Sequence, residues 1–429
     1  MIDVCILGGG VSGLSLAANL KKDSVILEKN NHAGGLCSSL QENGFTFDIA
    51  GPHILFSKNK KVLEYMKSIL GSNVHQKVRN SKILFKGKFI KYPFENGLSD
   101  LPKEDCFECI RDYIVNDYTK PPTNLEEWAY FTFGKSISEK YFLPYNKKIW
   151  NCEPSNISLD WVSRIPKPPM EDVLKSAIGI STEGYLHQLY FYYPKHGGYQ
   201  AITDAFTEQV KDKLLLNQEI LKIDKDGDSW KVTTSNDVIS CKTLVSTIPI
   251  HKLLTMWDGF PTKAHELVSK LKFNGLINVL LGTSNDNNIP YGTVYIADPN
   301  IASHRITFLK NFSEYNAPPD QDAIMVEITA NSTDDIWKLS NEKLVDKMSS
   351  ELDQLKLIQK DKVIYSKVIK FTFGYPVCDL EYNKNVNELY DIIESQGIHL
   401  LGRFGQFEYI NSDVCVEYAL ELADRLNAS

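Results

Sequence analysis

The sequence predicts an α/β protein in which a Rossmann-type dinucleotide-binding domain carries an inserted helical domain and an antiparallel β-sheet domain on the substrate side. Three observations predict this class. A glycine-rich turn joins an apolar strand to a helix near the N-terminus. A helical pattern of apolar residues covers residues 101–144, and alternating runs typical of strands recur over residues 276–371.

The N-terminal turn has the spacing of a phosphate-binding loop. The apolar strand of residues 2–7 leads into three spaced glycines and a helix over residues 11–20. The first glycine permits the tight turn, the second lets the backbone approach a pyrophosphate, and the third lets the helix pack against the strand. The helix N-terminus then faces the phosphates. The predicted phosphate-binding residues are Gly8, Gly10, Val11, Ser12 and Gly13.

An acidic residue after the second strand completes the fingerprint. Residues 25–27 are the predicted strand, and Glu28 follows 20 residues after Gly8. A carboxylate at this point can accept both hydroxyls of an adenosine ribose and would repel a 2′-phosphate, so NADP is disfavoured. We also expect Lys29, Ile220 and Thr247 to lie near the cofactor.

Two further glycines favour FAD over NAD. Gly34 and Gly35 lie six and seven residues after Glu28, where the chain would again approach the cofactor closely. A long, permanently bound FAD needs this second approach more than a transient NAD does. Gly35 and Leu36 are therefore predicted FAD contacts.

Composition limits the function classes. The chain has 429 residues, is 43% hydrophobic and carries a net charge of −7, which predicts two or three domains and argues against a nucleic-acid binder. No run approaches the ~18 apolar residues of a membrane span, and no signal segment precedes the first strand, so we expect a cytoplasmic protein. Cys106 and Cys109 form a lone CxxC without partners for a metal site, and we expect no metal.

Periodicity predicts the remaining elements in order. Helices are expected over residues 60–70, 103–117, 201–213, 251–257, 341–352 and 412–426. Strands are expected on both sides of Lys86-Gly87-Lys88 and over residues 215–223, 230–234, 238–241, 244–247, 277–281, 293–297, 306–309, 323–328, 363–370 and 398–401. The predicted domains are a discontinuous cofactor domain (1–95, 196–260 and 396–429), a helical insertion (96–184) and a sheet domain (185–195 and 261–395).

Four segments, in order along the chain, resemble UDP-galactopyranose mutases, a branch of the FAD family that also contains amine oxidases and protoporphyrinogen oxidases. They are a Gly-Pro-His-Ile-Leu segment at residues 51–55, a Tyr-x-x-Lys-x-Trp element at 145–150, a Gly-Gly-Tyr turn at 193–199 and a Gly-Arg…Tyr…Asp segment at 402–413. The resemblance implies that the histidine loop lies beside the flavin ring. It also implies that the last segment closes over the flavin.

The implied activity is the interconversion of pyranose and furanose forms of a nucleotide sugar, for surface polysaccharide biosynthesis. In that family N5 of reduced FAD attacks the anomeric carbon, the nucleoside diphosphate leaves, and the sugar ring recloses through another hydroxyl without net oxidation. The expected partners are a nucleotide sugar and an external reductant (NADH, NADPH or a flavin reductase). We expect no nucleic acid and allow for a homodimer.

The resemblance assigns roles to individual residues. His53 and Arg403 are the expected catalytic residues, and both are also expected to contact FAD. The expected substrate-binding residues are Tyr145, Lys148, Trp150, Arg164, Tyr185, Tyr193 and Tyr409. The expected FAD contacts near the C-terminus are Gly402, Arg403, Tyr409, Asn411 and Asp413.

Plainer readings stay open. His53 is also the kind of residue that satisfies a loop carbonyl, and Tyr145 and Trp150 are also typical core aromatic residues. Two arginines expected from the resemblance have no counterpart. In the run Arg-Ile-Pro-Lys-Pro-Pro at residues 164–169 a proline occupies the position expected for the first, and the run at residues 273–281 carries no arginine. An oxidase of the amine-oxidase or protoporphyrinogen-oxidase type is therefore the alternative, and a non-enzymatic FAD scaffold is a third reading.

Overall fold

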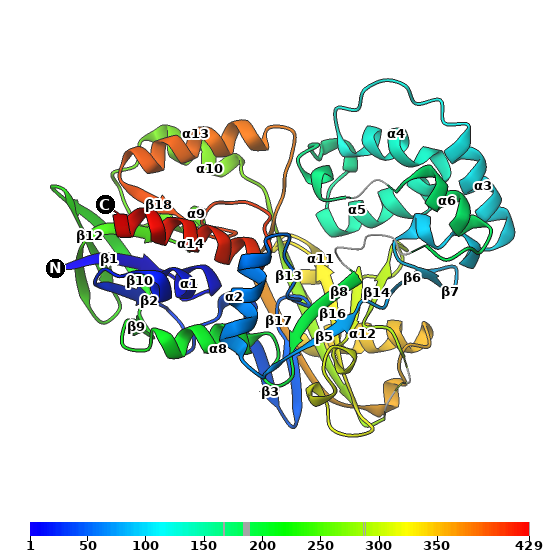
Figure 1. The fold of residues 1–429 in the computed structure, drawn as a ribbon, viewed down its shortest axis with the longest axis horizontal. Coiled ribbons are helices and arrows are strands. Elements are labelled where there is room, and N and C mark those ends of the chain that lie inside the picture. Colours follow the sequence, from blue (N-terminus) through cyan, green and yellow to red (C-terminus); the bar gives the residue numbers. More distant parts are fainter. Residues whose placement is uncertain (166–167, 183–188, 286, 288, 429) are drawn as a thin grey trace.

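The computed structural model describes residues 1–165, 168–182, 189–285, 287 and 289–428. Two seven-stranded sheets form the body of the molecule, and a group of helices stands beside the second sheet (Figure 1). Both chain ends lie at the side of the first sheet. No helix in the described part of the chain is long and apolar enough to cross a bilayer.

The first sheet is mixed. Its order is β10-β11-β12-β1-β2-β9, and β18 pairs with β12. β1 pairs in parallel with β12 and β2, β18 also runs parallel to β12, and the β10-β11-β12 edge is antiparallel. The strands are β1 (Ile2–Leu7), β2 (Ser24–Leu27), β9 (Leu214–Leu215), β10 (Ile220–Asp226), β11 (Ser229–Thr234), β12 (Val238–Ser246) and β18 (Ile398–Leu400). The C-terminal strand thus completes the N-terminal sheet, as predicted.

Helices cover both faces of this sheet. One face packs against α1 (Val11–Asn19), α2 (Lys60–Leu70), α8 (Gln200–Gln209) and α14 (Ser412–Ala428). The other packs against α9 (Ile250–Leu253), α10 (Thr262–Lys270) and α13 (Tyr382–Ser395). The alternation of β1 explains this division, because Val4 and Ile6 belong to the first core and Cys5 and Leu7 to the second.

Two strand predictions are wrong in this sheet. The predicted strand over residues 215–223 is broken, because Asn217 adopts a positive φ of 57° and β10 begins only at Ile220. The predicted strands over residues 238–241 and 244–247 are one strand, β12, of nine residues.

The second sheet is largely antiparallel, with the order β17-β13-β16-β15-β14-β6-β7. Its strands are β6 (Ser81–Phe85), β7 (Lys88–Lys91), β13 (Phe273–Thr283), β14 (Thr293–Ile296), β15 (Arg305–Phe308), β16 (Asp322–Thr329) and β17 (Val363–Pro376). The β6–β7 hairpin joins this sheet through a parallel pairing of β6 with β14. It therefore lies apart from the first sheet, with which the predicted limit of 1–95 had grouped it. The helices α11 (Asp335–Lys338) and α12 (Asn341–Gln354) supply residues to a core on one face.

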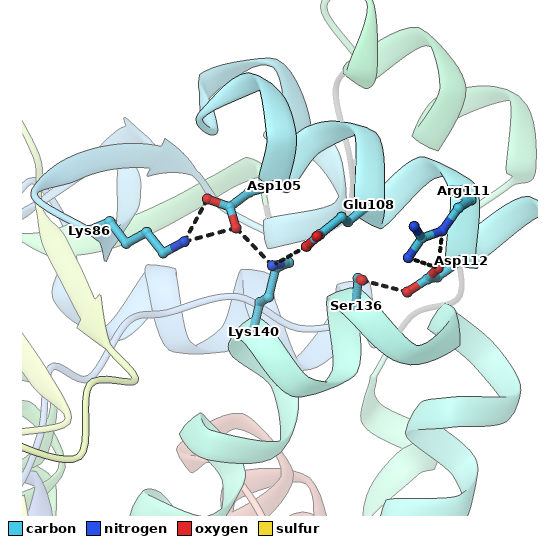
Figure 2. A network of polar contacts seen from close by, with 7 residues as sticks. All are labelled: Lys86, Asp105, Glu108, Arg111, Asp112, Ser136 and Lys140. Atoms are coloured by element: carbon cyan, nitrogen blue, oxygen red, sulfur yellow. Dashed lines mark hydrogen bonds and ion pairs between the residues drawn. The ribbon is translucent and has the colours of Figure 1, made fainter.

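The helical segment contains α3 (Lys103–Ile114), α4 (Leu125–Ile137), α5 (Leu143–Trp150) and α6 (Met170–Ala177), with a π-helical turn at Ser138–Phe142. Figure 2 shows how polar contacts tie it together. Asp105 of α3 accepts from Lys86 Nζ of the β6–β7 turn and from Lys140 Nζ, and Lys140 also pairs with Glu108 at 2.7 Å. Asp112 accepts from Ser136 at 2.5 Å. The network joins the helices to the second sheet.

Two small ribbons connect the main sheets. One pairs β3 (Ser39–Glu42) with β4 (Phe45–Asp48), and the other pairs β5 (Val74–Val78) with β8 (Tyr190–Pro194). In the second ribbon burial alternates, since Phe191 and Tyr193 are buried whereas Tyr190 is exposed. The chain passes from β4 directly into the segment that carries His53.

Candidate functional site

The glycine turn after β1 forms an open cradle at the N-terminus of α1. Gly8 has a φ of +105°, and a Cβ there would lie 2.5 Å from Thr247 Oγ1. A Cβ on Gly13 would lie 2.2 Å from the carbonyl oxygen of Gly8, whereas one on Gly10 would meet nothing within 4 Å. The N-cap of α1 is Gly10, which provides no side-chain cap, so a phosphate can take the helix N-terminus.

Glu28 stands beside this cradle at the end of β2. Its Oε2 accepts from the Gly9 amide at 2.8 Å, and its Oε1 accepts from the Asn30 amide at 2.9 Å. The side chain is buried, so these bonds fix the carboxylate where the second strand ends. This is the position from which an acid reaches the ribose of a bound dinucleotide. The neighbouring Lys29 is exposed.

The second glycine pair lies directly against the first turn. Gly34 donates its amide to the Gly9 carbonyl at 2.8 Å, and a Cβ on Gly35 would lie 3.3 Å from the Gly10 Cα. Leu36 and Ile220 contribute to the core on the α9–α13 side of the first sheet. Thr247 follows β12, and its hydroxyl donates to the Leu7 carbonyl at 2.8 Å.

The C-terminal segment closes the same region from another side. Gly402 has a φ of +83°, and a Cβ there would lie 2.5 Å from Ser12 Oγ, in the first turn of α1. Arg403 Nε donates to the Ile410 carbonyl at 2.8 Å, and its guanidinium lies 5.3 Å from the centre of the Tyr409 ring. Asn411 precedes α14, and Asp413 is buried in the first turn of that helix, where burial raises the pKa of its carboxyl.

His53 faces this segment from the loop after β4. Its Nδ1 lies 2.9 Å from the Gly51 carbonyl oxygen, and its ring stacks on Tyr199 at 5.1 Å. Burial, followed by the charges of Arg403 and Arg305, lowers the pKa of His53 to about 3. The ring is therefore neutral at physiological pH, and with Nδ1 bonded to the carbonyl its Nε2 is the nitrogen left to accept a proton.

A pocket of about 100 Å³ joins these parts. It is lined by His53, Phe56, Arg305, Tyr375, Arg403, Tyr409, Asn411, Ser412 and residues 50–52 and 54. Arg305 of β15 donates through Nε and Nη2 to both oxygens of Glu327, at 2.5 and 2.6 Å, and through Nη2 to the Tyr375 hydroxyl at 3.2 Å. The pocket wall thus presents two guanidinium groups, two phenols and a neutral imidazole.

A buried carboxylate supports the His53 loop from below. Asp48, at the end of β4, accepts from the Tyr193 hydroxyl at 3.0 Å and from the Tyr199 amide at 2.9 Å. The Tyr199 hydroxyl in turn lies 2.5 Å from Ser412 Oγ. Burial raises the pKa of Asp48 to about 6. These bonds connect the His53 loop to the start of α14.

The substrate-binding candidates occupy different surroundings. Tyr409 lines the pocket. Tyr145 is half-buried, with its ring edge-on to Tyr295 at 5.7 Å. Lys148 donates to the carbonyls of Ile296 and Asp298, at 3.2 and 2.8 Å, and burial lowers its pKa to about 8.

Two candidates are core residues. Trp150 is 1% exposed, and its ring meets those of Trp161 and Tyr409 edge-on. Tyr193 is fully buried against Asp48, so the structure does not bring it into the pocket. Tyr185 and the side chain of Arg164 lie outside the described part of the chain.

Sequence reasoning missed Arg305. β13 indeed carries no arginine, but the second sheet brings one to the pocket from β15, two strands away. The local signal was weak, because Arg305 stands at the beginning of a short apolar run. Only the pairing with Glu327, 22 residues later, explains how its charge is accommodated. Tyr375, Tyr199 and Asp48 were not predicted either, because their places in the site also depend on contacts between distant parts of the chain.

The residues present fit FAD. Open space at Gly10, the uncapped helix N-terminus and the fixed carboxylate of Glu28 suit the dinucleotide. The pocket between His53 and Arg403 continues from this cradle, because Gly402 packs on Ser12. The residues that would hold FAD are Gly8, Gly10, Val11, Ser12, Gly13, Glu28, Gly35, Gly402 and Arg403.

Comparisons with known proteins agree with this fit. The model of the flavin-containing amine oxidoreductase family matches residues 11–371. The dTDP-fucopyranose mutase of Escherichia coli is 25% identical over 180 residues, which are 39% of this chain and 46% of that protein. Canine flavin-containing amine oxidase A is 21% identical over 306 residues, 66% of this chain and 56% of that protein. The chain thus spans about half the length of these curated relatives.

One solved structure matches this chain over nearly the full length of both proteins. The crystal structure of reduced UDP-galactopyranose mutase superposes with a TM-score of 0.90 at 25% identity and covers 100% of this chain and 96% of that one. The fold of this chain is therefore that of a UDP-galactopyranose mutase, within the amine oxidase superfamily.

Proposed function

The chain belongs to the flavin-containing amine oxidoreductase family, and from this premise we propose that it is a FAD-dependent mutase that interconverts pyranose and furanose forms of a nucleotide sugar. The observation that carries the proposal is Arg305 in the pocket beside His53 and Arg403. Support also comes from the match to reduced UDP-galactopyranose mutase and from the similarity to a dTDP-fucopyranose mutase.

The pocket chemistry suits an anionic leaving group. When bound, reduced FAD would supply a nucleophilic nitrogen to the anomeric carbon, and a nucleoside diphosphate would depart without net oxidation. Glu327 and Tyr375 bind the Nε and Nη2 groups of Arg305 and so fix the orientation of its guanidinium, including its Nη1 donors. A fixed guanidinium can stabilise the charge that develops on a departing phosphate.

His53 and the phenols have a different part in the proposal. His53 is neutral, so it can accept a proton or a hydrogen bond from a sugar hydroxyl without adding charge. Tyr375 and Tyr409 wall the pocket and stack against the Arg403 guanidinium, which limits its movement. We assign sugar orientation to these three residues.

An amine oxidase is the second candidate, supported by the family match and the similarity to amine oxidase A. The pocket disfavours a protonated amine, because two guanidinium groups line it and, among the residues that the structure describes, only that of Arg305 is paired with a buried carboxylate. Such a substrate would be repelled where it must bind.

The test incubates the FAD-loaded protein with UDP-, dTDP- and GDP-linked hexoses, with and without dithionite. We expect furanose product only with reduced flavin, at a yield set by equilibrium and with no peroxide. Arg305→Lys should lower turnover by about 100-fold, since lysine cannot keep the bidentate contact with Glu327 and donate to substrate as well. Stoichiometric substrate oxidation with peroxide release would establish the oxidase instead.

A further inference from the structure

Both ends of the segment that carries His53, residues 48–53, contact one tyrosine. The Asp48 carboxylate at the start of the segment accepts from the Tyr199 amide at 2.9 Å. The His53 ring at its end stacks on the Tyr199 ring, with the ring centres 5.1 Å apart. The Tyr199 hydroxyl is itself bonded to Ser412 Oγ at 2.5 Å. Tyr199 therefore links the carboxylate to the imidazole.

Asp48 is a fully buried carboxylate that only neutral donors bind. Its Oδ1 accepts from the Tyr199 amide and from the Ser39 hydroxyl, at 2.9 and 2.8 Å, and its Oδ2 accepts from the Tyr193 hydroxyl at 3.0 Å. In the described part of the chain, no lysine or arginine forms an ion pair with it. Burial of a carboxylate costs free energy that burial of an apolar residue does not. This cost points to a role for the bonds that Asp48 makes.

The second sheet contacts the middle of the same segment. Gly51 has a φ of +108°, and a Cβ there would lie 3.3 Å from both Arg305 Nη2 and Glu327 Oε1. The backbone at Gly51 thus packs directly on this ion pair and has no room to move toward it. The orientation of the His53 ring then depends on Tyr199, on which the ring stacks.

We propose that Asp48 is a positioning residue for His53: by binding the Tyr199 amide, it holds in place the ring on which the imidazole stacks. Asp48 does not line the pocket, so it acts through Tyr199 and not on the substrate. The inference rests on the proposed function for its consequence, which is that a displaced His53 no longer meets the sugar. The position of the imidazole itself can be measured without any substrate.

A plainer role for Asp48 is to cap α8. The amides of Tyr199 and Gln200 begin this helix, and their acceptors are Asp48 Oδ1 at 2.9 Å and Ser39 Oγ at 3.1 Å. The helix dipole also favours a carboxylate at this end. Because Ser39 accepts from Gln200 and not from Tyr199, Ser39→Ala is the matched control for a loss of capping alone.

NMR of the FAD holoenzyme with ¹³C-labelled histidine tests the proposal, and His53→Gln assigns the His53 signal. In the wild type this signal should not titrate between about pH 5 and pH 8, because the pKa of the buried imidazole is lowered to about 3. Asp48→Ala removes the acceptor of the Tyr199 amide, so the ring should gain access to water. Its pKa should then rise toward the ordinary value of about 6.5 and stay below it, since Arg403 and Arg305 remain nearby.

Three further variants identify the cause of such a shift. Asp48→Asn keeps an oxygen for the Tyr199 amide and should restore the signal that does not titrate. Tyr199→Leu removes the stacked ring and should act like Asp48→Ala, and the double variant should shift the pKa no further than either change alone. Ser39→Ala should lower the melting temperature and leave the His53 signal unchanged. With a nucleotide sugar, kcat should fall by about 10- to 100-fold in Asp48→Ala, with little change in KM.

Several results would overturn the inference. One is a His53 signal that still does not titrate in folded, FAD-loaded Asp48→Ala. Another is an equal titration in Ser39→Ala, which would assign the whole effect to capping. Titration in Asp48→Asn as well would assign it to the charge instead of the bond to Tyr199.

A folding defect and a failure of the proposed function are also distinguished. If Asp48→Ala does not fold, Asp48→Leu, which fills the space of the carboxylate, is measured in its place. Failure of both variants to fold and hold FAD would identify Asp48 as a structural residue and would overturn the inference. Failure of the wild type to convert any nucleotide sugar would reject only the proposed function, because the NMR comparison involves no substrate.

Discussion

Gly10 and Gly13 stand three residues apart in one turn, yet an added methyl group would meet different surroundings at each. A Cβ on Gly13 would come within 2.2 Å of a backbone oxygen that cannot move away, whereas a Cβ on Gly10 would point into open space. Gly10 also has a φ of −78°, which alanine adopts without strain. Alanine substitutions at the two glycines can therefore distinguish an effect on folding from an effect on cofactor binding.

We predict that Gly10→Ala folds normally but binds FAD poorly. The unfolding free energy of the apoprotein should change by less than about 0.5 kcal/mol, while FAD affinity should fall by on the order of tenfold or more because the methyl group occupies the pyrophosphate space. Gly13→Ala should cost the apoprotein about 1–3 kcal/mol. Chemical denaturation and FAD titration measure both quantities. If Gly10→Ala leaves the FAD affinity unchanged, the pyrophosphate does not bind at this turn.

His304 provides a second residue-level prediction. It is fully buried, and neither ring nitrogen has a hydrogen-bond partner among the described residues. Burial, then the charges of Arg305 and Lys148, holds its pKa well below the ordinary value of 6.5. In the unfolded chain the ring titrates normally, so below pH 6.5 the unfolded state takes up a proton that the folded state excludes.

Stability should therefore fall on acidification, and His304→Leu should remove part of that fall. Between pH 7.5 and 5.5 the wild type is expected to lose about 1.4 kcal/mol more unfolding free energy than the variant. Urea denaturation at several pH values measures the difference. His265→Gln, an exposed histidine on α10, is the control and should parallel the wild type. Parallel pH profiles for His304→Leu and wild type would mean that His304 ionises in the folded protein.

At the scale of elements, α3 and the π-helical turn are joined by a carboxylate that serves two lysines. Asp105 is largely buried and accepts from Lys86 and Lys140, at 2.8 Å each. Burial alone would raise its pKa, but the hydrogen bonds from Lys140 and Lys86 outweigh burial and lower it. The ionised form therefore stabilises the fold above the carboxyl pKa of the unfolded chain, and this contribution is lost as the pH falls.

We predict that Asp105→Asn lowers the unfolding free energy by about 1–3 kcal/mol, since Lys140 loses its buried counter-charge. Lys86 contributes little to this loss because it is 59% exposed. Glu64→Gln, which breaks an exposed pair with Lys67 on α2, is the matched control and should cost under about 0.5 kcal/mol. Equal effects of the two substitutions would show that the Figure 2 network adds no more than a surface pair.

Local patterns predicted elements better than they predicted partners. The helix over residues 60–70 is confirmed to the residue, because Asn59 caps it and its apolar residues repeat at helical spacing. Two features of the structure depend on pairings between distant residues. One is the sheet to which β6 and β7 belong, and the other is the arginine that lies opposite Glu327 and lines the pocket. No local period encodes such a register. For the same reason the cofactor-binding turn could be predicted from the sequence, whereas the position of Arg305 in the pocket could not.

At the scale of the whole molecule, the candidate site is assembled from segments that are far apart in the chain. The turn at residues 8–13, the pair Gly34 and Gly35, the His53 loop and the segment at residues 402–413 meet around one cradle and one pocket. The Tyr199 hydroxyl bond to Ser412 and the packing of Gly402 on Ser12 hold these segments together. Binding of one long cofactor should therefore be felt at both ends of the sequence.

Hydrogen exchange of the apoprotein and the FAD-loaded protein tests this arrangement. We expect FAD to slow exchange in all four segments together, because each would lose solvent access or local opening when the cofactor bridges them. The helix α12 (Asn341–Gln354), which packs on the second sheet away from the cradle, serves as the internal control and should exchange at the same rate in both forms. Protection confined to the first 37 residues would indicate a nucleotide bound at the N-terminal turn alone. In that case the pocket between His53 and Arg403 would not be the flavin end of the site, and the roles assigned to both residues would fail with it.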